Sequence, residues 1–416
     1  MSEFIFAEQN GRKIPVADKI FKINGQAKAA MAAKGAENVI TATLGALYDE
    51  EGKMVVLSSV VDVLKSLEPT DYAEYAPICG TPAFREYVKK AAFGSYELDC
   101  YAEAVAAPGG TGAIRNAVSN FSKPGDVILT SDWHWPAYNN IAQEQGRSLT
   151  TYELTNAEGG FNIASFKEKA SELIEKQGSL IAIINSPAHN PTGYSLTTDE
   201  WQQLVDAAKE MTAEGKKKMT ILVDAAYIDF AGERDEVRKF LPILTGLPEN
   251  ILPLMAYSMS KTFTLYGMRG GALICMAPTK EIADEFRRVC EYSSRASWSN
   301  CSRPAMMVLS KIYEDPALLE KVDAERRSAR EMLHRRGKAF EEEAVKVGLK
   351  MVPFDSGFFA SVPYPDPDAL AAKLQEYDVF LIPFAKGIRV SLAGISEASC
   401  RKIPALIVKA MKELDK

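Results

Sequence analysis

Lys261 lies where a charged side chain is costly. It stands between two apolar runs, residues 251–256 and 272–275, which are both typical of buried strands. Burying an ammonium group is unfavourable unless the group is paired or neutralised. A lysine in such a place can give up its charge and bond covalently to the carbonyl group of a cofactor. Ser258 and Arg269 flank it with a hydroxyl and a permanent cation, which both suit a phosphate. The alternative is a solvated lysine at the end of a strand.

A glycine-rich turn precedes a predicted helix at residues 108–113, Pro-Gly-Gly-Thr-Gly-Ala. Its glycines, Gly110 among them, allow a ligand to approach the backbone, and the helix-end N–H groups with the Thr111 hydroxyl can cradle a phosphate. The turn is not the G-x-G-x-x-G dinucleotide fingerprint, because Arg115 occupies the place of the third glycine. A tight chain turn without a ligand is the alternative.

Two further side chains follow predicted strands. Trp135 comes after residues 127–130, and an indole beyond a strand end can lie flat on an aromatic cofactor ring. Asn190 comes after residues 180–185 and can donate from its amide to a phenolate oxygen. The alternatives are a tryptophan packed in the core and a plain turn.

Asp224 closes an apolar strand, and Tyr227 follows three residues later. A carboxylate at a buried strand end needs a cation or hydrogen-bond donors. A protonated pyridine nitrogen would supply one, and Tyr227 could donate to an oxygen on the same ring. The alternative is an aspartate that caps the next segment.

These groups match one ligand. A phosphate cradle, a stacking indole, a phenolate donor, a pyridinium acceptor and a Schiff-base lysine together predict pyridoxal 5′-phosphate as the cofactor. The motifs all follow strands of one predicted sheet, and ligands of such sheets bind just beyond the carboxyl ends of the strands.

The elements that would position these groups are short apolar strands that alternate with helices. This pattern favours an α/β fold with a mainly parallel sheet covered on both faces. The predicted strands are residues 104–107, 127–130, 149–153, 180–185, 221–225, 252–257 and 272–276. Helices are expected at residues 58–67 and from Pro82, with Thr81 as N-cap, to about residue 93.

The ends of the chain have a different pattern. Residues 350–416 predict a compact α+β unit with strands near 358–362, 379–381 and 388–392 and a helix at 397–414. A long helical stretch interrupted near Asp315-Pro316 precedes it, and residues 13–33 could be a helix or an arm. We therefore expect a large cofactor-binding domain at 50–324 and a small domain made of 1–49 and 325–416.

Composition excludes several classes of function. The length of 416 residues predicts two domains, and 47% hydrophobic with 25% charged residues is ordinary for a soluble protein. No apolar run is long enough to span a bilayer, and the first six residues do not resemble a secretory signal. The net charge of −6 argues against nucleic acid as a partner. An arginine cluster at residues 326–336 is interspersed with glutamates, which favours a solvated helix face.

The spacing of the cysteines and histidines favours reduced thiols and argues against a metal site. The six cysteines are scattered and form no C-x-x-C pair, which is typical of reduced thiols and predicts a cytoplasmic protein. None of the three histidines has ligand spacing with a cysteine or carboxylate, so no metal site is expected.

The chain resembles the fold type I enzymes that use pyridoxal phosphate, and within them the aspartate/aromatic aminotransferase branch of class I. The resemblance covers nearly the whole length. It rests on residues 39–53, Glu74-Tyr75-Ala76-Pro77-Ile78-Cys79-Gly80, Gly110-Thr111-Gly112-Ala113, Asn190-Pro191-Thr192-Gly193, Asp224 with Tyr227, Ser258-x-x-Lys261 with Arg269, and Arg389-Val390-Ser391-Leu392-Ala393-Gly394. It implies a three-layer PLP-transferase fold and a homodimer with shared active sites.

The resemblance assigns roles around the cofactor. Lys261 would form the Schiff base and later move a proton between the substrate Cα and the cofactor. Asp224 would hold the pyridinium, and Trp135 would stack on the ring. Asn190 and Tyr227 would bind the phenolic oxygen. The phosphate ligands would be Gly110, Thr111, Ser258 and Arg269, joined by Tyr75 of the partner subunit.

The resemblance also assigns roles around the substrate. Arg389 would grip the α-carboxylate as a bidentate fork, and Gly45 would lie beside the substrate, with Trp135 and Asn190. Arg295 resembles an arginine that crosses the dimer interface to bind the side-chain carboxylate of dicarboxylic substrates. The alternative is an arginine on a solvated helix, like Arg287 upstream.

Two departures from the family pattern concern the surroundings of these groups. Ala137-Tyr138 stands where the aspartate enzymes often have Asn-His, which leaves the support of Asp224 open. Asn300-Cys301-Ser302 stands in place of a common Asn-Pro-Pro. Both changes bear on substrate choice more than on cofactor binding.

The resulting prediction is a transaminase that exchanges an amino group between an acidic or aromatic amino acid and a 2-oxo acid such as 2-oxoglutarate. One alternative is a lyase or decarboxylase on the same scaffold, which would release ammonia or carbon dioxide without a 2-oxo acceptor. Another is a cofactor-sensing regulator that binds DNA, which the low basic charge and the lack of an additional helix-turn-helix region argue against.

Overall fold

The computed structural model describes residue 6 and residues 18–415. The predictions for residues 1–5 and 7–17, including the start of the expected arm and the absence of a secretory signal, lie outside this range. From residue 19 onward the predicted helix or arm is helix α1, Lys19–Lys34, whose N-cap Asp18 accepts hydrogen bonds from the backbone of Ile20 and Phe21.

A seven-stranded sheet forms the centre of the molecule, in the order β2-β8-β7-β6-β5-β3-β4. The strands are β2 (Tyr101–Ala106), β3 (Val127–Ser131), β4 (Ser148–Tyr152), β5 (Ser179–Asn185), β6 (Lys218–Asp224), β7 (Ile251–Ser258) and β8 (Gly271–Ala277). Neighbours from β4 to β7 pair in parallel, whereas β8 is antiparallel to β7 and β2. The predicted mainly parallel sheet is confirmed.

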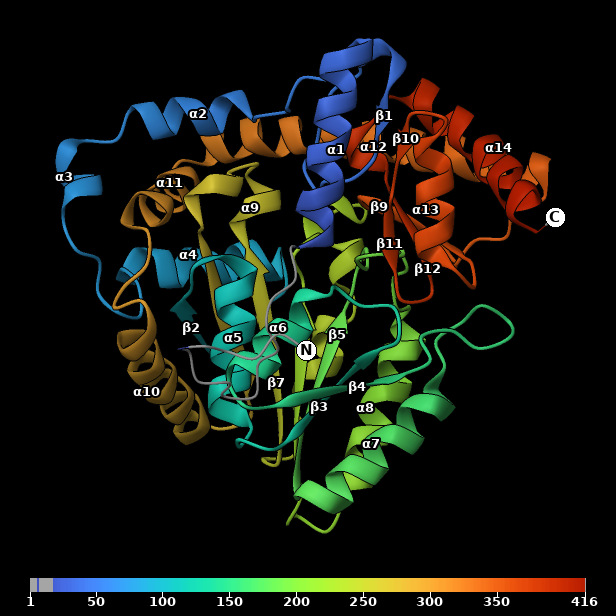
Figure 1. The fold of residues 1–416 in the computed structure, drawn as a ribbon. Coiled ribbons are helices and arrows are strands. Elements are labelled where there is room, and N and C mark those ends of the chain that lie inside the picture. Colours follow the sequence, from blue (N-terminus) through green and yellow to red (C-terminus); the bar gives the residue numbers. More distant parts are fainter. Residues whose placement is uncertain (1–5, 7–17, 416) are drawn as a thin grey trace.

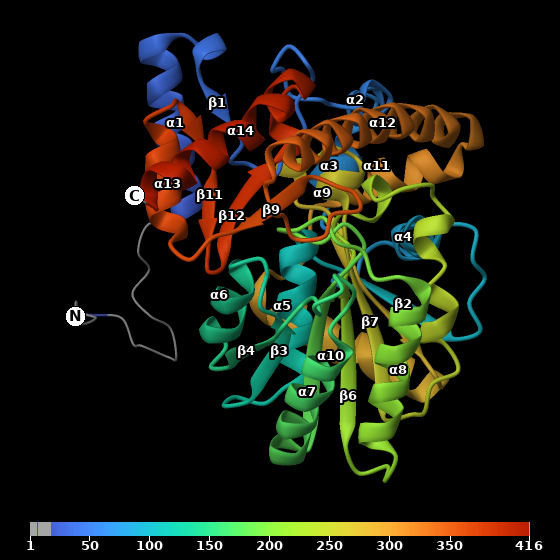
Figure 2. The ribbon, with the colours of Figure 1, turned by 90° about the vertical axis from the view of Figure 1, so that its right-hand side faces the viewer.

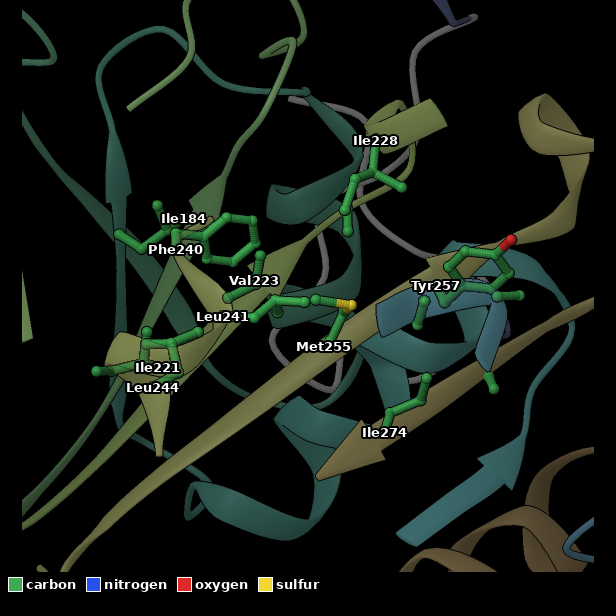
Figure 3. Close-up of a cluster of buried hydrophobic side chains, with 14 of the residues drawn as sticks. Ile184, Ile221, Val223, Ile228, Phe240, Leu241, Leu244, Met255, Tyr257 and Ile274 are labelled. Carbon is green, nitrogen blue, oxygen red and sulfur yellow. The ribbon is translucent and has the colours of Figure 1, made fainter. Parts of the chain in front are cut away.

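Helices cover both faces of this sheet and make three layers (Figure 2). Successive strand residues point to opposite faces. Ile221 and Val223 of β6 therefore join one hydrophobic cluster with helices α7 and α8, part of which Figure 3 shows. Leu222 between them joins a second cluster with α5 and α10. These helices are α5 (Gly109–Phe121), α6 (Ala137–Glu144), α7 (Ile163–Gln177), α8 (Thr198–Thr212) and α10 (Lys280–Ser297).

A smaller α+β unit, coloured red with blue α1 beside it, lies next to the sheet (Figure 1). Strands β11 (Ile382–Phe384), β12 (Gly387–Ser391) and β9 (Phe359–Pro363) form an antiparallel sheet, and β1 (Ile40–Thr41) pairs in parallel with β10 (Val379–Phe380). Helices α13 (Pro367–Gln375) and α14 (Glu397–Leu414) enclose a hydrophobic cluster of its own. The predicted strands and the last helix of this unit are confirmed.

Further helices and short 3₁₀ turns complete the two parts. They are α2 (Ser58–Lys65), α3 (Pro69–Ala73), α4 (Pro82–Phe93), α9 (Met259–Thr262), α11 (Arg303–Glu314), α12 (Pro316–Val347) and the 3₁₀ turns η1 (Ala36–Asn38), η2 (Ile228–Phe230), η3 (Glu236–Arg238), η4 (Leu241–Leu244), η5 (Tyr266–Met268) and η6 (Leu392–Gly394). Thr81 caps α4, and the helical stretch breaks at Asp315-Pro316, as predicted.

Helix α12 is 32 residues long and packs against α11 at one end and α14 at the other (Figure 2). The prediction of a solvated arginine face on this helix was wrong in part. Arg327 and Arg335 are exposed, but Arg326 and Arg336 are buried. No helix among the described residues is long and apolar enough to cross a membrane.

Candidate active site

One cavity of about 390 Å³ collects most of the predicted site residues at the carboxyl ends of the central strands. Its lining includes Gly45, Gly110, Thr111, Trp135, Asn190, Asp224, Tyr227, Ser258, Lys261, Arg269 and Arg389. The smaller α+β unit contributes Arg389 and Phe359 to the wall, so the cavity lies between the sheet and this unit.

Lys261 lies in α9, a helix of four residues that follows β7 directly. The side-chain hydroxyl of Ser258 caps this helix by accepting from the backbone N–H of Ser260 at 3.3 Å. Burial, reinforced by the positive charge of Arg269, lowers the pKa of Lys261 to about 8. The amine is therefore far more often neutral near physiological pH than an exposed lysine, which makes it a better nucleophile.

Asp224 ends β6 and is buried. The hydroxyl of Tyr138 donates to its Oδ2 at 2.5 Å, and the backbone N–H of Ala226 donates to Oδ1 at 3.2 Å. Burial raises the pKa of Asp224, while these hydrogen bonds and the charge of Lys261 act against the rise. Tyr138 thus supports Asp224 at a place where the family pattern often has a histidine.

Arg389 on β12 is buried and only partly paired. Its Nη1 donates to Oδ1 of Asn190 at 3.1 Å, and its Nη2 donates to the carbonyl of Thr43 at 2.6 Å. Its Nε has no hydrogen-bond partner among the described residues, and the guanidinium carbon lies 4.2 Å from the ring centroid of Phe359. Burial lowers its pKa to about 10. A buried cation with a free donor is prepared to receive a carboxylate.

The turn before α5 faces Arg269 and Ser258. A Cβ atom at Gly109 would lie 2.7 Å from Nη2 of Arg269, and one at Gly110 would lie 3.3 Å from Cβ of Ser258. The guanidinium of Arg269 is held by Ser260 Oγ at 3.0 Å and by the carbonyl of Tyr266 at 3.1 Å. The first N–H groups of α5 and this cation converge, as a phosphate site requires.

Two predicted residues do not line the cavity within this single chain. Tyr75 is 88% exposed, and Arg295 is exposed near the end of α10, where its Nη1 donates to Ser299 Oγ at 2.6 Å. Both were expected to act from a partner subunit, and that expectation stays a prediction.

The structure adds residues that the sequence analysis did not single out. Asn185 at the end of β5 accepts from the backbone of Asn190 at 2.6 Å and donates to the carbonyl of Asp224 at 2.8 Å, so it joins two predicted residues. Its position at a predicted strand end was a signal that could have revealed it. Asp18, Ile20 and Phe21 at the start of α1 also line the cavity, and no local sequence pattern indicates this.

The sequence analysis also predicted that there is no metal site. The described residues contain no group of three or more histidine, cysteine, aspartate or glutamate side chains that could hold an ion.

Comparison with known proteins identifies the family. Residues 37–405 match the family model for aminotransferase class I and II. The crystal structure of an aminotransferase from Anaerococcus prevotii DSM 20548 has 36% sequence identity and a TM-score of 0.95, and the match covers 98% of this chain and 99% of that one. Aspartate aminotransferase of Escherichia coli K12 is 26% identical over 378 residues, covering 88% of this chain and 92% of the relative. The aromatic-amino-acid aminotransferase of Pseudomonas aeruginosa is 27% identical over 282 residues, covering 66% and 68%.

The match to the family model spans most of the chain, and the relatives found are themselves named aminotransferases. The chain belongs to the aminotransferase class I and II family, which confirms the predictions of a transaminase and of pyridoxal phosphate as its cofactor.

Proposed function

We propose that this transaminase moves an amino group between an acidic or aromatic amino acid and a 2-oxo acid such as 2-oxoglutarate. The observation that carries the proposal is one cavity that holds a half-buried lysine of lowered pKa, a buried carboxylate and a partly paired buried arginine. Relatives named aspartate and aromatic-amino-acid aminotransferase support these two substrate classes.

The residues of the cavity fit pyridoxal phosphate. A side chain at Gly109 would crowd Arg269 and one at Gly110 would crowd Ser258, and both of these neighbours line the cavity, so the two glycines keep this end of it open. Gly110, Thr111, Ser258 and Arg269 would hold the phosphate. When bound, the cofactor supplies an aldehyde for covalent attachment to an amine and a ring that withdraws electrons from the substrate Cα.

The ring would be held by residues from three strand ends. Asp224 would accept from the pyridine nitrogen, and Asn190 and Tyr227 would bind the phenolic oxygen. Trp135 would stack on the ring. Tyr138 keeps one oxygen of Asp224 hydrogen-bonded, which favours the charged carboxylate that a pyridinium needs.

Lys261 would act as the general base and then as the general acid. With a pKa of about 8, its Nζ exchanges readily between the neutral and charged forms near physiological pH. The neutral amine can take the proton from the substrate Cα, and the resulting ammonium can then deliver that proton to the cofactor.

Substrate recognition would divide between two arginines. Arg389 would bind the α-carboxylate of every substrate through its free donor and its fork geometry. The wall beside it contains Gly45, Phe359 and the apolar side chains at the start of α1, and it suits an aromatic side chain. Arg295 of the partner subunit would bind the second carboxylate of aspartate or glutamate.

The assembly and location that accompany this function are proposals as well. We propose a large domain at 50–324 and a small domain at 1–49 and 325–416, which places the boundary inside α12. The exposure of Tyr75 supports a homodimer in which this residue reaches the partner's phosphate site. Six unpaired cysteines support a cytoplasmic location.

The proposal is tested with purified protein, a panel of amino acids and 2-oxoglutarate. We expect glutamate formation and a change in cofactor absorbance with acidic and aromatic donors. Activity with donors outside both classes, and none within them, would contradict the substrate assignment. Release of ammonia or carbon dioxide without any need for a 2-oxo acid would contradict transamination.

A further inference from the structure

Two arginines of α12, Arg326 and Arg336, are buried. Arg336 donates from Nε and Nη2 to Oε1 of Glu50 at 2.9 and 2.8 Å, and from Nη1 to the carbonyls of Leu392 and Ala393 at 3.4 and 3.3 Å. That segment directly follows the strand of Arg389. The other buried arginine, Arg326, lies near the segment that follows Lys261.

Arg326 belongs to a buried cluster centred on Asp229 in η2. Oδ1 of Asp229 accepts from Nη2 of Arg238 at 2.6 Å, and Oδ2 lies 3.6 Å from Nη1 of Arg326. The exposed side-chain fractions are 8% for Asp229, 0% for Arg238 and 7% for Arg326. The two guanidinium groups hold the pKa of the carboxyl at about 2, so it is charged at every ordinary pH.

The same carboxylate binds the residue next to Lys261. Oδ2 of Asp229 accepts from the hydroxyl of Thr262 at 2.8 Å, and this threonine is fully buried. The ring of Phe263, one residue further, lies with its centroid 5.4 Å from the guanidinium carbon of Arg326. Both residues after Lys261 are therefore held by the cluster.

Helix α9 needs such an anchor because it has only four residues. A helix of one turn does not hold its geometry by its own hydrogen bonds. Ser258 fixes its first turn on the phosphate side. The hydroxyl of Thr262 ties its last residue to Asp229, which stands two residues after Tyr227. The lysine lies between these two anchors.

We propose that Asp229 is a positioning residue for Lys261 and acts through its hydrogen bond to Thr262. The role rests on the proposed function of Lys261 as the amine that moves the proton. Asp229 does not line the cavity, and its carboxylate is already occupied by Thr262 and two arginines, so it directs the lysine without touching the substrate. Because Arg389 is held by other residues, we expect the chemical step to depend on Asp229 and substrate binding to depend on it much less.

The test removes the hydrogen bond and leaves the charges paired. Asp229→Asn would leave the buried Arg238 without its carboxylate partner and Arg326 with Asp323 alone, so this variant risks failing to fold. Thr262→Val removes only the hydroxyl at nearly constant volume, and Thr262→Ser keeps it. Thr212→Val is the matched control, since Thr212 is equally buried but donates to the carbonyl of Ala208 at the end of α8, away from the cavity.

The measurements are kcat and KM per bound cofactor, and the pH dependence of the cofactor absorbance. A misplaced amine should lower kcat of Thr262→Val by roughly ten- to a hundredfold. KM for the amino donor should change by less than about threefold, because the interactions of Arg389 are kept. The pH midpoint of the absorbance should shift, because the charge interactions of Lys261 with Arg269 and Asp224 depend on distance. Thr262→Ser should restore both values.

The outcomes separate this inference from the proposed function. If the unmodified enzyme transaminates and Thr262→Val keeps its kcat and its pH midpoint, the positioning role is wrong. The same holds if Thr262→Val loses activity only in proportion to lost folded protein, as Thr212→Val would. If the unmodified enzyme does not transaminate acidic or aromatic donors, the proposed function is wrong instead.

Discussion

The hydroxyl of Tyr138 donates a hydrogen bond of 2.5 Å to Oδ2 of Asp224. Both side chains are buried, and burial alone would push the carboxyl toward its neutral form. Tyr138 opposes this without bringing a charge of its own, because burial and Asp224 raise the pKa of its hydroxyl well above 10 and keep it protonated. Tyr138 is therefore a neutral donor that supports Asp224 at a place where the aspartate enzymes that the chain resembles often have a histidine.

Tyr138→Phe should weaken the hold on the pyridine nitrogen. The lost bond goes to a charged group, which is worth about 1.5–3 kcal/mol and corresponds to a fall in cofactor affinity of roughly ten- to a hundredfold. Equilibrium dialysis of the cofactor, together with kcat at saturating cofactor, measures the effect.

Tyr194→Phe is the control for that change. Its hydroxyl donates to a carboxylate too, Oε1 of Glu200 at 2.6 Å, but neither residue lines the cavity. Equal losses of cofactor affinity in the two variants would show that Tyr138 acts only through general stability.

Lys261→Ala should abolish turnover, because no other amine among the residues that line the cavity could take its place. The phosphate and ring contacts remain, so the cofactor should still bind without a covalent bond. Loss of the lysine-linked absorbance and of product formation in a coupled assay checks this. Normal turnover in the variant would be incompatible with the assigned role.

The pKa of Lys261 gives a pH prediction. In the apo-protein, attachment of pyridoxal should speed up as the pH rises through about 8, since only the neutral amine attacks the aldehyde. Arg269 is one of the cations that lower this pKa, so Arg269→Met should move the midpoint to higher pH. Pyridoxal lacks the phosphate that Arg269 would bind, so the shift reports the charge on the lysine. An unchanged or lower midpoint would contradict the role of Arg269.

The site residues that follow strand ends were the ones predicted best from the sequence. Asp224, Asn190 and Lys261 each follow an apolar run, and parallel strands bring such ends to one edge, so the order of the residues alone was enough to expect their meeting. The antiparallel direction of β8 could not be predicted in this way, because an apolar run has the same sequence pattern whichever way the strand runs. The burial of Arg326 and Arg336 was missed because Arg326 pairs not only with nearby Asp323 but also with Asp229, and Arg336 pairs with Glu50, and these last two acids lie far away in the sequence. Tyr75 is exposed in this chain, and exposure alone does not tell a residue that would act on a partner subunit from an ordinary surface residue.

Variants of Arg295 test the proposed basis of substrate choice. If its guanidinium binds the side-chain carboxylate from across the interface, Arg295→Ala should cut kcat/KM for aspartate by roughly a hundredfold, the cost of leaving one carboxylate unpaired in a partly buried site. Phenylalanine and tyrosine carry no such carboxylate, so their kcat/KM should change by less than about threefold. Arg287→Ala is the control, because this arginine lies on the same helix and pairs with Glu291 at 3.7 Å. Steady-state kinetics with the three donors measures all of these values. Equal losses for aspartate and phenylalanine would mean that Arg295 supports the fold or the dimer and does not select the substrate.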